Sequence, residues 1–268
     1  MDLFKITVPK KDIVPIIISI PHAGTHFPSG IRKNYRKRLR KYLDDTDWFV
    51  DKLYDFAPEM GITVIKANLS RWVIDLNRDS ENIPLYNDNR LITSITPVTD
   101  FLGNEIYKSK KLIPNAKEVK KRIKKYYNPY HKKLQDLIND RKQQFGKVLL
   151  WDAHSIRHKV STIQHDVFPD MILGDNDQKT AHTKLIETAL AGLKTGDFKV
   201  SHNSPFKGGQ ITRSLGNPKE NIHTLQLEMN KILYMDDNEL HYNKERAGKV
   251  KKVLKTTLEN LIETLKEI

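Results

Sequence analysis

The sequence predicts one α/β domain with a mainly parallel or mixed central sheet that carries helices on both faces. Short runs of β-branched and other apolar residues alternate with longer amphipathic segments along the chain, and this alternation is typical of a sheet covered by helices. A chain of 268 residues is long enough to bury one large core. Neither an internal repeat nor a low-complexity linker divides the chain, so residues 1–268 are interpreted as a single domain.

Strands are expected where short apolar runs end in polar residues. Val14 to Ile20 is rich in β-branched residues and stops at Pro21, so it predicts a buried strand that leads into a loop. Loops in this position carry the sites of open α/β sheets, because ligands bind at the carboxyl ends of the strands. The other expected strands are 62–67, 148–151, 198–202 and 224–228. The segment 72–76 is expected to continue the strand at 62–67 or to pair with it.

Helices are expected between these strands. A long helix with Pro129 as a kink or break is the clearest of them. The polar, turn-rich stretch from Asn87 to Gly103 instead predicts a surface loop that could cover a site. Four helices are expected. The first begins after an acidic N-cap at 44–47, the second runs from about 115 to 144, the third from 178 to 193, and the fourth begins near 243.

The charge of the chain does not favour a nucleic-acid partner. A formal net charge of +13 attracts phosphates in principle. Most of this charge lies in the segments 32–41, 108–142 and 244–266, where lysines and arginines alternate with apolar residues as on a solvated helix face. No nucleic-acid partner is therefore expected.

Composition also limits the kinds of site and location. The chain has no cysteine, so disulfides and thiolate metal ligands are excluded, and a metal must be held by His, Asp or Glu. The longest apolar run, Ile13 to Ile20, is too short to cross a bilayer, and the N-terminal residues lack a signal-peptide pattern. The expectation is a soluble cytoplasmic protein without a membrane partner, whose oligomeric state is open.

Three of the expected strands end in ionisable residues. His22 follows the first strand, Asp152 and His154 follow another, and Glu228 ends a third. Side chains two residues apart on a strand point the same way, so Asp152 and His154 can face one site. Two histidines and a carboxylate with an open position form the pattern of a catalytic zinc centre. Taken singly, each histidine also fits a polar surface position, and Glu228 also fits a cap or a lysine pair.

The segment from Arg71 to Arg78 adds a second kind of chemistry. An apolar run that ends in Asn77 and Arg78 supplies a side-chain amide and a planar cation, which together suit a substrate carboxylate. The alternative for this segment is an Arg–Asp ion pair at a turn.

Several motifs in order resemble the N-formylglutamate amidohydrolase family. No single motif is decisive, but their order and spacing in combination are specific for the family. The resemblance covers nearly the whole chain, from about Ile16 to about Asp237. The motifs are Ile20 to Gly24, Arg71 to Arg78, Asp152 to Ser155, Asn203 to Gly209 and Leu225 to Asn230, with Tyr127 to His131 and Leu233 to Met235 as further matches.

The resemblance implies a fold like that of zinc carboxypeptidases and aspartoacylases, to which the family is similar. It implies that His22 and His154 bind zinc. Glu228 matches the carboxylate that acts as general base and then gives the proton to the leaving amine. Asn77 and Arg78 match the pair that binds the substrate carboxylate.

The third zinc ligand departs from the pattern of the relatives. They take a glutamate three residues after the first histidine, where this sequence has Thr25. The third ligand must therefore come from elsewhere. Asp47 is the preferred choice, because it starts a helix just after the first-strand loop, and Asp44, Asp45 and Asp152 are the alternatives.

Two further arginines have candidate roles. Arg71 resembles the arginine that stabilises the developing oxyanion, although it lies one residue closer to the following motif than in aspartoacylases. Arg213 is a candidate for the second carboxylate of a dicarboxylic substrate, and its alternative is a strand arginine paired with an acidic neighbour. Lys207 and the turn at Gly208 and Gly209 are candidates for the pocket wall or a moving flap.

The resemblance implies zinc-dependent hydrolysis of N-formyl-L-glutamate to formate and L-glutamate, the last step of one bacterial route of histidine degradation. A related zinc deacylase or peptidase-like amidase with another N-acyl substrate is the enzymatic alternative. A basic binding protein on a degenerate hydrolase scaffold is the alternative of a different class. The joint presence of the candidate zinc, catalytic and carboxylate-binding residues argues against that last interpretation.

Overall fold

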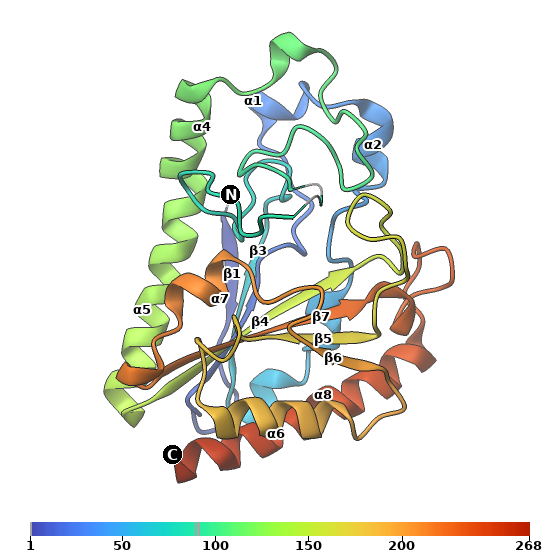
Figure 1. The fold of residues 1–268 in the computed structure, drawn as a ribbon. Helices are drawn as coiled ribbons and strands as arrows, with labels where there is room; N and C mark the ends of the chain where they lie inside the picture. Colours follow the sequence, from blue (N-terminus) through green and yellow to red (C-terminus); the bar gives the residue numbers. More distant parts are fainter. Residues whose placement is uncertain (1, 89, 91) are drawn as a thin grey trace.

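A seven-stranded mixed sheet forms the centre of the computed structural model, which describes residues 2–88, 90 and 92–268 (Figure 1). The strand order is β1-β3-β2-β4-β7-β5-β6. Strands β3, β2, β4 and β7 run parallel, whereas β1 is antiparallel to β3 and β5 is antiparallel to β7. The expected α/β fold with a mixed sheet is confirmed. The strands are β1 Phe4–Thr7, β2 Ile16–Ile20, β3 Thr63–Ala67, β4 Val148–Ile156, β5 Met171–Gly174, β6 Val200–His202 and β7 Ile222–Asn230.

The central strands are buried on both faces, as their apolar sequences require. All five residues of β2 and all nine residues of β4 are buried. A strand that is covered on both sides gains apolar burial from every residue, which explains the continuous apolar runs of the sequence. Alternate residues of β4 point to opposite faces of the sheet. Leu149 and Trp151 pack in the core cluster on one face, and Val148 and Leu150 pack in the cluster on the other face.

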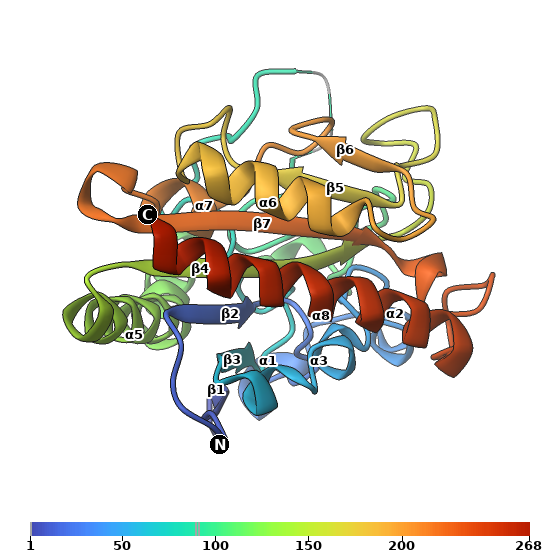
Figure 2. The same cartoon turned by 90° about the horizontal axis from the view of Figure 1, so that it is seen from below.

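Helices cover both faces of the sheet. On one face α6 (Thr183–Leu193) and α8 (Lys244–Glu267) lie side by side, with the short α3 (Val50–Leu53) next to α8 (Figure 2). On the other face lie α4 (Ala116–Arg122), the π-helical η3 (Ile123–Tyr127), α5 (Asn128–Phe145) and α7 (Gln210–Leu215). The shorter helical segments are α1 Ser29–Arg32, α2 Lys37–Lys41, η1 Ala57–Met60, η2 Lys110–Leu112, η4 Pro218–Glu220 and η5 Lys231–Leu233.

The long helix over 115–144 has the break that Pro129 predicts. Proline has no N–H group and cannot continue the i→i−4 pattern, and the π-helical turn η3 lies directly before it. Asn115 caps the first part, because its side chain accepts a hydrogen bond from the N–H of Glu118. Asn243 likewise caps α8, which therefore begins where the sequence predicts.

The expected strand from Trp72 to Leu76 is wrong. This run is buried but forms turns, because its backbone bonds to other loops rather than to a strand. The N–H of Asp75 donates to the carbonyl of Ile95 at 2.7 Å, and the N–H of Val73 donates to Ser70 at 2.9 Å. The apolar run had suggested a strand that continues or pairs with 62–67, but its hydrogen bonds to other segments give turns instead. Strands β1 and β5 were not expected.

The stretch from Asn87 to Gly103 has neither helix nor strand among its described residues, and its residues 89 and 91 lie outside them. Its Ile92 and Phe101 line the cavity that is described below. The expectation of a long loop over the site is confirmed for the described part of the stretch.

Across the described residues, no helix combines the length and the apolar content that are needed to cross a membrane.

Candidate metal centre and active site

The carboxyl ends of β2, β4 and β7 bring ionisable side chains to one edge of the sheet. His22 follows β2, and His154 near the end of β4 stands opposite Glu228 of β7 in the register. Asp47 joins them from the loop before α3, where its backbone N–H donates to the carbonyl of His22 at 3.0 Å. The parallel order of the three strands thus gathers residues that are far apart in the sequence.

His22, Asp47 and His154 form a buried cluster whose ligand atoms all lie within 4.8 Å of one another. The Oδ2 atom of Asp47 is 3.1 Å from Nδ1 of His154 and 3.8 Å from Nδ1 of His22. Within the described residues, Nδ1 of His22 and Oδ1 of Asp47 are buried without a hydrogen-bond partner. Unpartnered buried polar atoms are costly. Imidazole nitrogen and carboxylate oxygen are zinc ligands, so the three residues fit a zinc ion.

Each histidine of the cluster is oriented by a buried carboxylate on its far side. Nε2 of His22 is 2.8 Å from Oδ1 of Asp75, and Nε2 of His154 is 2.9 Å from Oδ2 of Asp152. Such carboxylate–histidine pairs fix the ring and leave the other nitrogen free for a metal. The Nδ1 atoms of both rings therefore face the centre, together with Asp47.

The two neighbouring aspartates that were considered as third ligands have other partners. Oδ1 of Asp44 accepts a hydrogen bond from Nη1 of Arg157 at 3.0 Å. In Asp45, Oδ2 accepts from the indole of Trp72 at 2.8 Å and Oδ1 accepts from the N–H of Phe101 at 3.0 Å. Asp45 therefore fastens the loop at Phe101 to the body of the protein, and neither residue belongs to the cluster with both histidines.

The charges around the cluster favour a cation at its centre. Burial, with the positive charge of Arg71 acting in the same direction, lowers the pKa of His22 to about 4 and keeps its ring neutral. Burial also acts to lower the pKa of His154, but the carboxylates of Asp152 and Asp47 raise it well above its usual range. The same carboxylates that hold a proton on His154 can hold a metal ion in its place.

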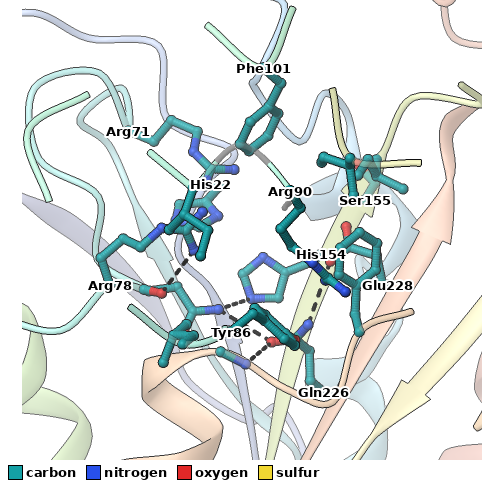
Figure 3. Close-up of a pocket in the computed structure, with 17 residues that line it drawn as sticks. His22, Arg71, Arg78, Tyr86, Arg90, Phe101, His154, Ser155, Gln226 and Glu228 are labelled. Carbon is teal, nitrogen blue, oxygen red and sulfur yellow. Dashed lines mark hydrogen bonds between the residues drawn. The ribbon is translucent and has the colours of Figure 1, made fainter. Parts of the chain in front are cut away.

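A cavity of about 80 Å³ opens onto this cluster (Figure 3). Its wall combines several cations with one acid and with apolar side chains, a lining that suits a small anionic ligand. The charged lining residues are Arg71, Arg78, Arg90 and Glu228, and the apolar and aromatic ones are Leu85, Tyr86, Ile92, Phe101, Ile156, Ile163 and Phe206.

Glu228 lines the cavity next to the cluster. Burial raises its pKa to about 8, and repulsion from Asp47 and Asp152 adds to this against the attraction of His154 and Arg71. Oε2 of Glu228 accepts a weak hydrogen bond at 3.5 Å from the side-chain amide of Gln226, which lies two residues earlier on the same strand. A carboxyl group with a pKa near neutrality can both accept and donate a proton.

Asn77 reaches the cavity from the buried turn and links several elements. Its Nδ2 lies 3.0 Å from Nε2 of His154 and 3.3 Å from Oε1 of Gln226, and its Oδ1 accepts from the N–H of Ile211 at 2.8 Å. A Cβ atom on Gly209 would lie 2.3 Å from Nδ2 of Asn77, so the close approach requires glycine there. The amide of Asn77 therefore links the buried turn to α7 and β7 at the cavity wall, next to the ring of His154.

Arg78 lines the cavity beside Asn77. Its Nε donates to the carbonyl of Thr93 at 3.0 Å and its Nη2 donates to Oγ1 of Thr93 at 3.2 Å. Among the acidic residues that the structure describes, none forms an ion pair with Arg78, and burial lowers its pKa. A buried guanidinium without an acidic partner can bind a carboxylate.

Arg71 forms the ion pair that was the alternative interpretation of its segment. Its Nη2 donates to Oδ2 of Asp75 at 2.6 Å, and the ring of Phe101 lies 4.6 Å from its guanidinium carbon. Arg71 also lines the cavity. The residue therefore places positive charge at the cavity wall while it fixes the carboxylate that orients His22.

Arg213 lies in helix α7 and not in a strand. Its Nε donates to the carbonyl of Gly208 at 2.8 Å and its Nη1 donates to the carbonyl of Leu85 at 2.8 Å, with its guanidinium carbon 4.9 Å from the ring of Tyr86. The cavity-lining residues include Arg90 but not Arg213. The role of Arg213 towards a substrate stays a prediction.

Sequence reasoning missed three residues of the site. Gln226 lies two residues before Glu228 on one strand, so the period of two was a usable signal for it. Asp75 was noticed only as the partner of Arg71, and no local pattern indicates its contact with His22. Arg90 lies in an irregular loop whose path no periodicity predicts.

The chain is similar to known proteins over most of its length. A family model described as N-formylglutamate amidohydrolase matches residues 14–235. An N-formylglutamate deformylase of Pseudomonas putida is 37% identical over 252 residues, covering 93% of this chain and 92% of that protein. Its namesake from Pseudomonas aeruginosa is 36% identical over 256 residues, covering 94% of each.

The fold agrees with these matches. The crystal structure of N-formylglutamate amidohydrolase from Ralstonia eutropha JMP134 has a TM-score of 0.83 at 26% identity and covers 100% of this chain and 99% of that one. A solved protein from Agrobacterium tumefaciens, 18% identical, shares the fold with a TM-score of 0.70 over 97% of this chain and 96% of its own. Since sequence and fold both match over nearly the full length, this chain is an amidohydrolase that belongs to the N-formylglutamate amidohydrolase family.

Proposed function

We propose that this chain hydrolyses N-formyl-L-glutamate to formate and L-glutamate with a zinc ion held by His22, Asp47 and His154. The observation that carries the proposal is the buried cluster of these three residues, with its unpartnered ligand atoms, beside Glu228 in a cavity lined by arginines. The names of the relatives from the two Pseudomonas species support the substrate.

Glu228 carries the proton transfers in this proposal. A zinc ion in such a site polarises the formyl carbonyl and makes water more acidic. Glu228 takes a proton from the water that attacks the formyl carbon, and it gives the proton to the nitrogen as the C–N bond breaks. Burial raises the pKa of Glu228 to about 8, close enough to neutral pH for the carboxyl group both to take up and to release a proton.

The arginines bind and stabilise negative charge. Arg78 has no acidic partner among the described residues, so we assign to it the α-carboxylate of the substrate, with Asn77 beside it. Arg71 lies at the cavity wall near His22, and its positive charge favours the oxyanion that develops on the formyl oxygen. His22 and His154 keep their positions through Asp75 and Asp152.

A related zinc deacylase with another N-acyl substrate is the alternative, and a substrate panel distinguishes the two. The zinc-loaded protein is assayed with N-formyl, N-acetyl and N-succinyl derivatives of glutamate and of neutral amino acids. The highest kcat/KM is expected for N-formyl-L-glutamate. A higher value for an acetyl or succinyl derivative contradicts the proposed acyl group. A place in histidine degradation and a cytoplasmic location stay predictions.

Variants of Glu228 and His154 test the mechanism. Glu228→Gln keeps the shape of the side chain but cannot take a proton, so kcat is expected to fall by about 10² to 10⁴ while bound zinc stays near one per chain. His154→Ala is expected to lose most of the zinc. Both quantities are measured by steady-state kinetics and elemental analysis of the purified proteins.

Glu105→Gln is the matched control, because Glu105 is exposed and pairs with Arg36 away from the cavity. It is expected to keep both zinc and kcat. A fully active Glu228→Gln protein contradicts the mechanism, whereas loss of zinc from that variant makes Glu228 a ligand. Full zinc content in His154→Ala contradicts the proposed ligand set.

A further inference from the structure

Three arginines line the cavity, and their partners differ. Arg71 already forms a buried ion pair with the carboxylate of Asp75 at 2.6 Å. Arg78 bonds to the carbonyl and hydroxyl oxygens of Thr93, and no ion pair joins it to an acid in the described part of the chain. Arg90 pairs with Asp88 at 2.7 Å, and the Asp88 side chain is 47% exposed. Arg78 and Arg90 are thus the two guanidinium groups that an incoming anion can reach without disturbing a buried pair.

Arg90 is held in place by contacts on several sides. Its guanidinium carbon lies 4.0 Å from the ring centre of Tyr86 and 5.9 Å from that of Phe206, and its Nη1 donates to the carbonyl of Pro205 at 3.1 Å. Tyr86 is fixed in turn, because its hydroxyl accepts from the backbone N–H of Lys207 at 2.9 Å. An arginine stacked on an aromatic ring still presents its planar edge to a carboxylate, and in Arg90 the Nε and Nη2 edge is occupied by the carboxylate of Asp88.

Arg213 also contacts the ring of Tyr86. It lies 4.9 Å from the ring centre of Tyr86 and bonds to the carbonyls of Leu85 and Gly208. Its Nε and Nη1 groups donate to backbone carbonyls, whereas the partner of Arg90 is a half-exposed carboxylate that a substrate can replace. Arg90 faces the cavity (Figure 3). Arg213 is not among the lining residues, and its contact with Tyr86 helps to position that ring.

We infer that Arg90 is the specificity-determining residue that binds the side-chain carboxylate of the acidic substrate, while Arg78 binds the α-carboxylate. This inference rests on the proposed function. A glutamyl substrate brings two carboxylates, and the cavity offers two guanidinium groups on separate segments, after the buried turn and in the loop beyond Tyr86. Asp88 holds Arg90 before the substrate arrives, and the substrate carboxylate takes over this pairing. Derivatives of neutral amino acids leave Arg90 paired with Asp88, so Arg90 contributes no binding energy to them.

The test compares N-formyl-L-glutamate with N-formyl-L-glutamine, which has nearly the same shape but no side-chain charge. The measured quantity is the ratio of kcat/KM for the two substrates. Arg90→Gln is expected to lower this ratio about 10- to 100-fold, the range of a charge-assisted hydrogen bond. Arg90→Lys keeps the charge but not the planar fork, so its ratio is expected to fall about 3- to 10-fold. If Arg90→Gln does not fold, a fall of threefold or more in Arg90→Lys decides the question.

Arg213→Gln is the matched control, since it removes an arginine that contacts Tyr86 but is not among the cavity-lining residues. It is expected to change kcat/KM for both substrates by a similar factor and to leave the ratio within about twofold of the wild type. An equal loss on both substrates in Arg90→Gln overturns the inference, and so does a loss of selectivity in Arg213→Gln alone. If the wild type hydrolyses neither substrate, the proposed function fails instead, so the two failures are distinguishable.

Discussion

Replacing Asp75 by Asn tests how far the metal centre depends on the carboxylate behind His22. Asp75 is fully buried and accepts three hydrogen bonds, from Nε2 of His22 at 2.8 Å, from Nη2 of Arg71 at 2.6 Å and from the N–H of Asn77 at 2.9 Å. Burial acts to raise its pKa, but Arg71 and His22 lower it well below the usual range, so the residue is ionised. Asparagine has one carbonyl oxygen, and its NH₂ group must face either His22 or Arg71, both of which are donors.

Two effects of different size are expected from Asp75→Asn. Loss of the carboxylate that orients a metal-binding histidine typically weakens metal affinity about 10- to 100-fold, or about 1.4 to 2.8 kcal/mol. Arg71 also loses its buried partner, and an uncompensated buried charge costs about 3 to 5 kcal/mol of folding stability. The zinc-free variant is therefore expected to be clearly less stable than the zinc-free wild type, in addition to binding zinc more weakly.

Asp152→Asn separates the two effects. Asp152 supports His154 at 2.9 Å, but its contacts are with His154 and the amide of Asn77 and not with an arginine. This variant is expected to lose zinc affinity to a similar degree with a smaller loss of stability. Zinc affinity is measured by competition with a chelator, and stability by denaturant unfolding of the zinc-free proteins. Zinc affinity within twofold of the wild type in Asp75→Asn refutes the reasoning about the centre.

Three further predictions concern the third ligand, substrate binding and pH. Asp47→Ala is expected to lower bound zinc while Asp44→Ala retains it, and elemental analysis showing the reverse makes Asp44 the ligand. Arg78→Ala is expected to raise KM for N-formyl-L-glutamate more than it lowers kcat, and an unchanged KM removes Arg78 from the pocket. Burial, with the positive charges of His182 and Lys147 adding, lowers the pKa of His223 from 6.5 to about 4, so the unfolded chain binds this proton at a higher pH than the folded one. The free energy of unfolding is therefore expected to fall as the pH drops from 6.5 to 4. In His223→Gln this loss is expected to be smaller by about 1 to 2 kcal/mol, and urea titrations at the two pH values measure it.

The sheet and its reactive edge could be predicted from the sequence because both follow from local patterns. The apolar runs of β2, β4 and β7 mark buried strands, and the ionisable residues at their ends then share one edge. The period of two places Asp152 and His154 on one side, and the structure finds them in contact at 2.9 Å. Asp47 was preferred from its place after the first loop, and it lies within the cluster of possible ligand atoms.

The rest of the site depends on loop paths, which local patterns do not determine. The run from Trp72 to Leu76 is as apolar as a strand, but its backbone hydrogen bonds go to neighbouring loops. Arg90 reaches the cavity only because the loop packs against Pro205 and Phe206, more than a hundred residues later in the chain. Arg213 was a candidate for the second carboxylate, and the structure places it in a helix after the glycine turn, where it bonds to backbone carbonyls.

The charge balance of the buried centre gives a last prediction, on metal removal. Asp47, Asp75 and Asp152 are buried around the two histidines, and Arg71 is the buried guanidinium among them. Among the groups in direct contact with the two histidines or with one another, three carboxylates against one guanidinium leave an excess of two negative charges, which a divalent cation cancels. A proton on His154 cancels only one of them, so the metal-free protein keeps a charge that destabilises its folded state.

Zinc is therefore expected to raise the thermal unfolding temperature of chelator-treated protein in a concentration-dependent way. Binding to the folded state alone contributes about 2.7 kcal/mol when free zinc is a hundred times its Kd. His154→Ala removes one ligand but leaves the surface of the protein unaltered, so it is expected to show little of this rise. A scanning calorimeter records both proteins over the same zinc series. An equal rise in the variant places the stabilising zinc elsewhere, and no rise in the wild type contradicts the charge argument, because the buried charge that remains without metal is expected to cost folding stability.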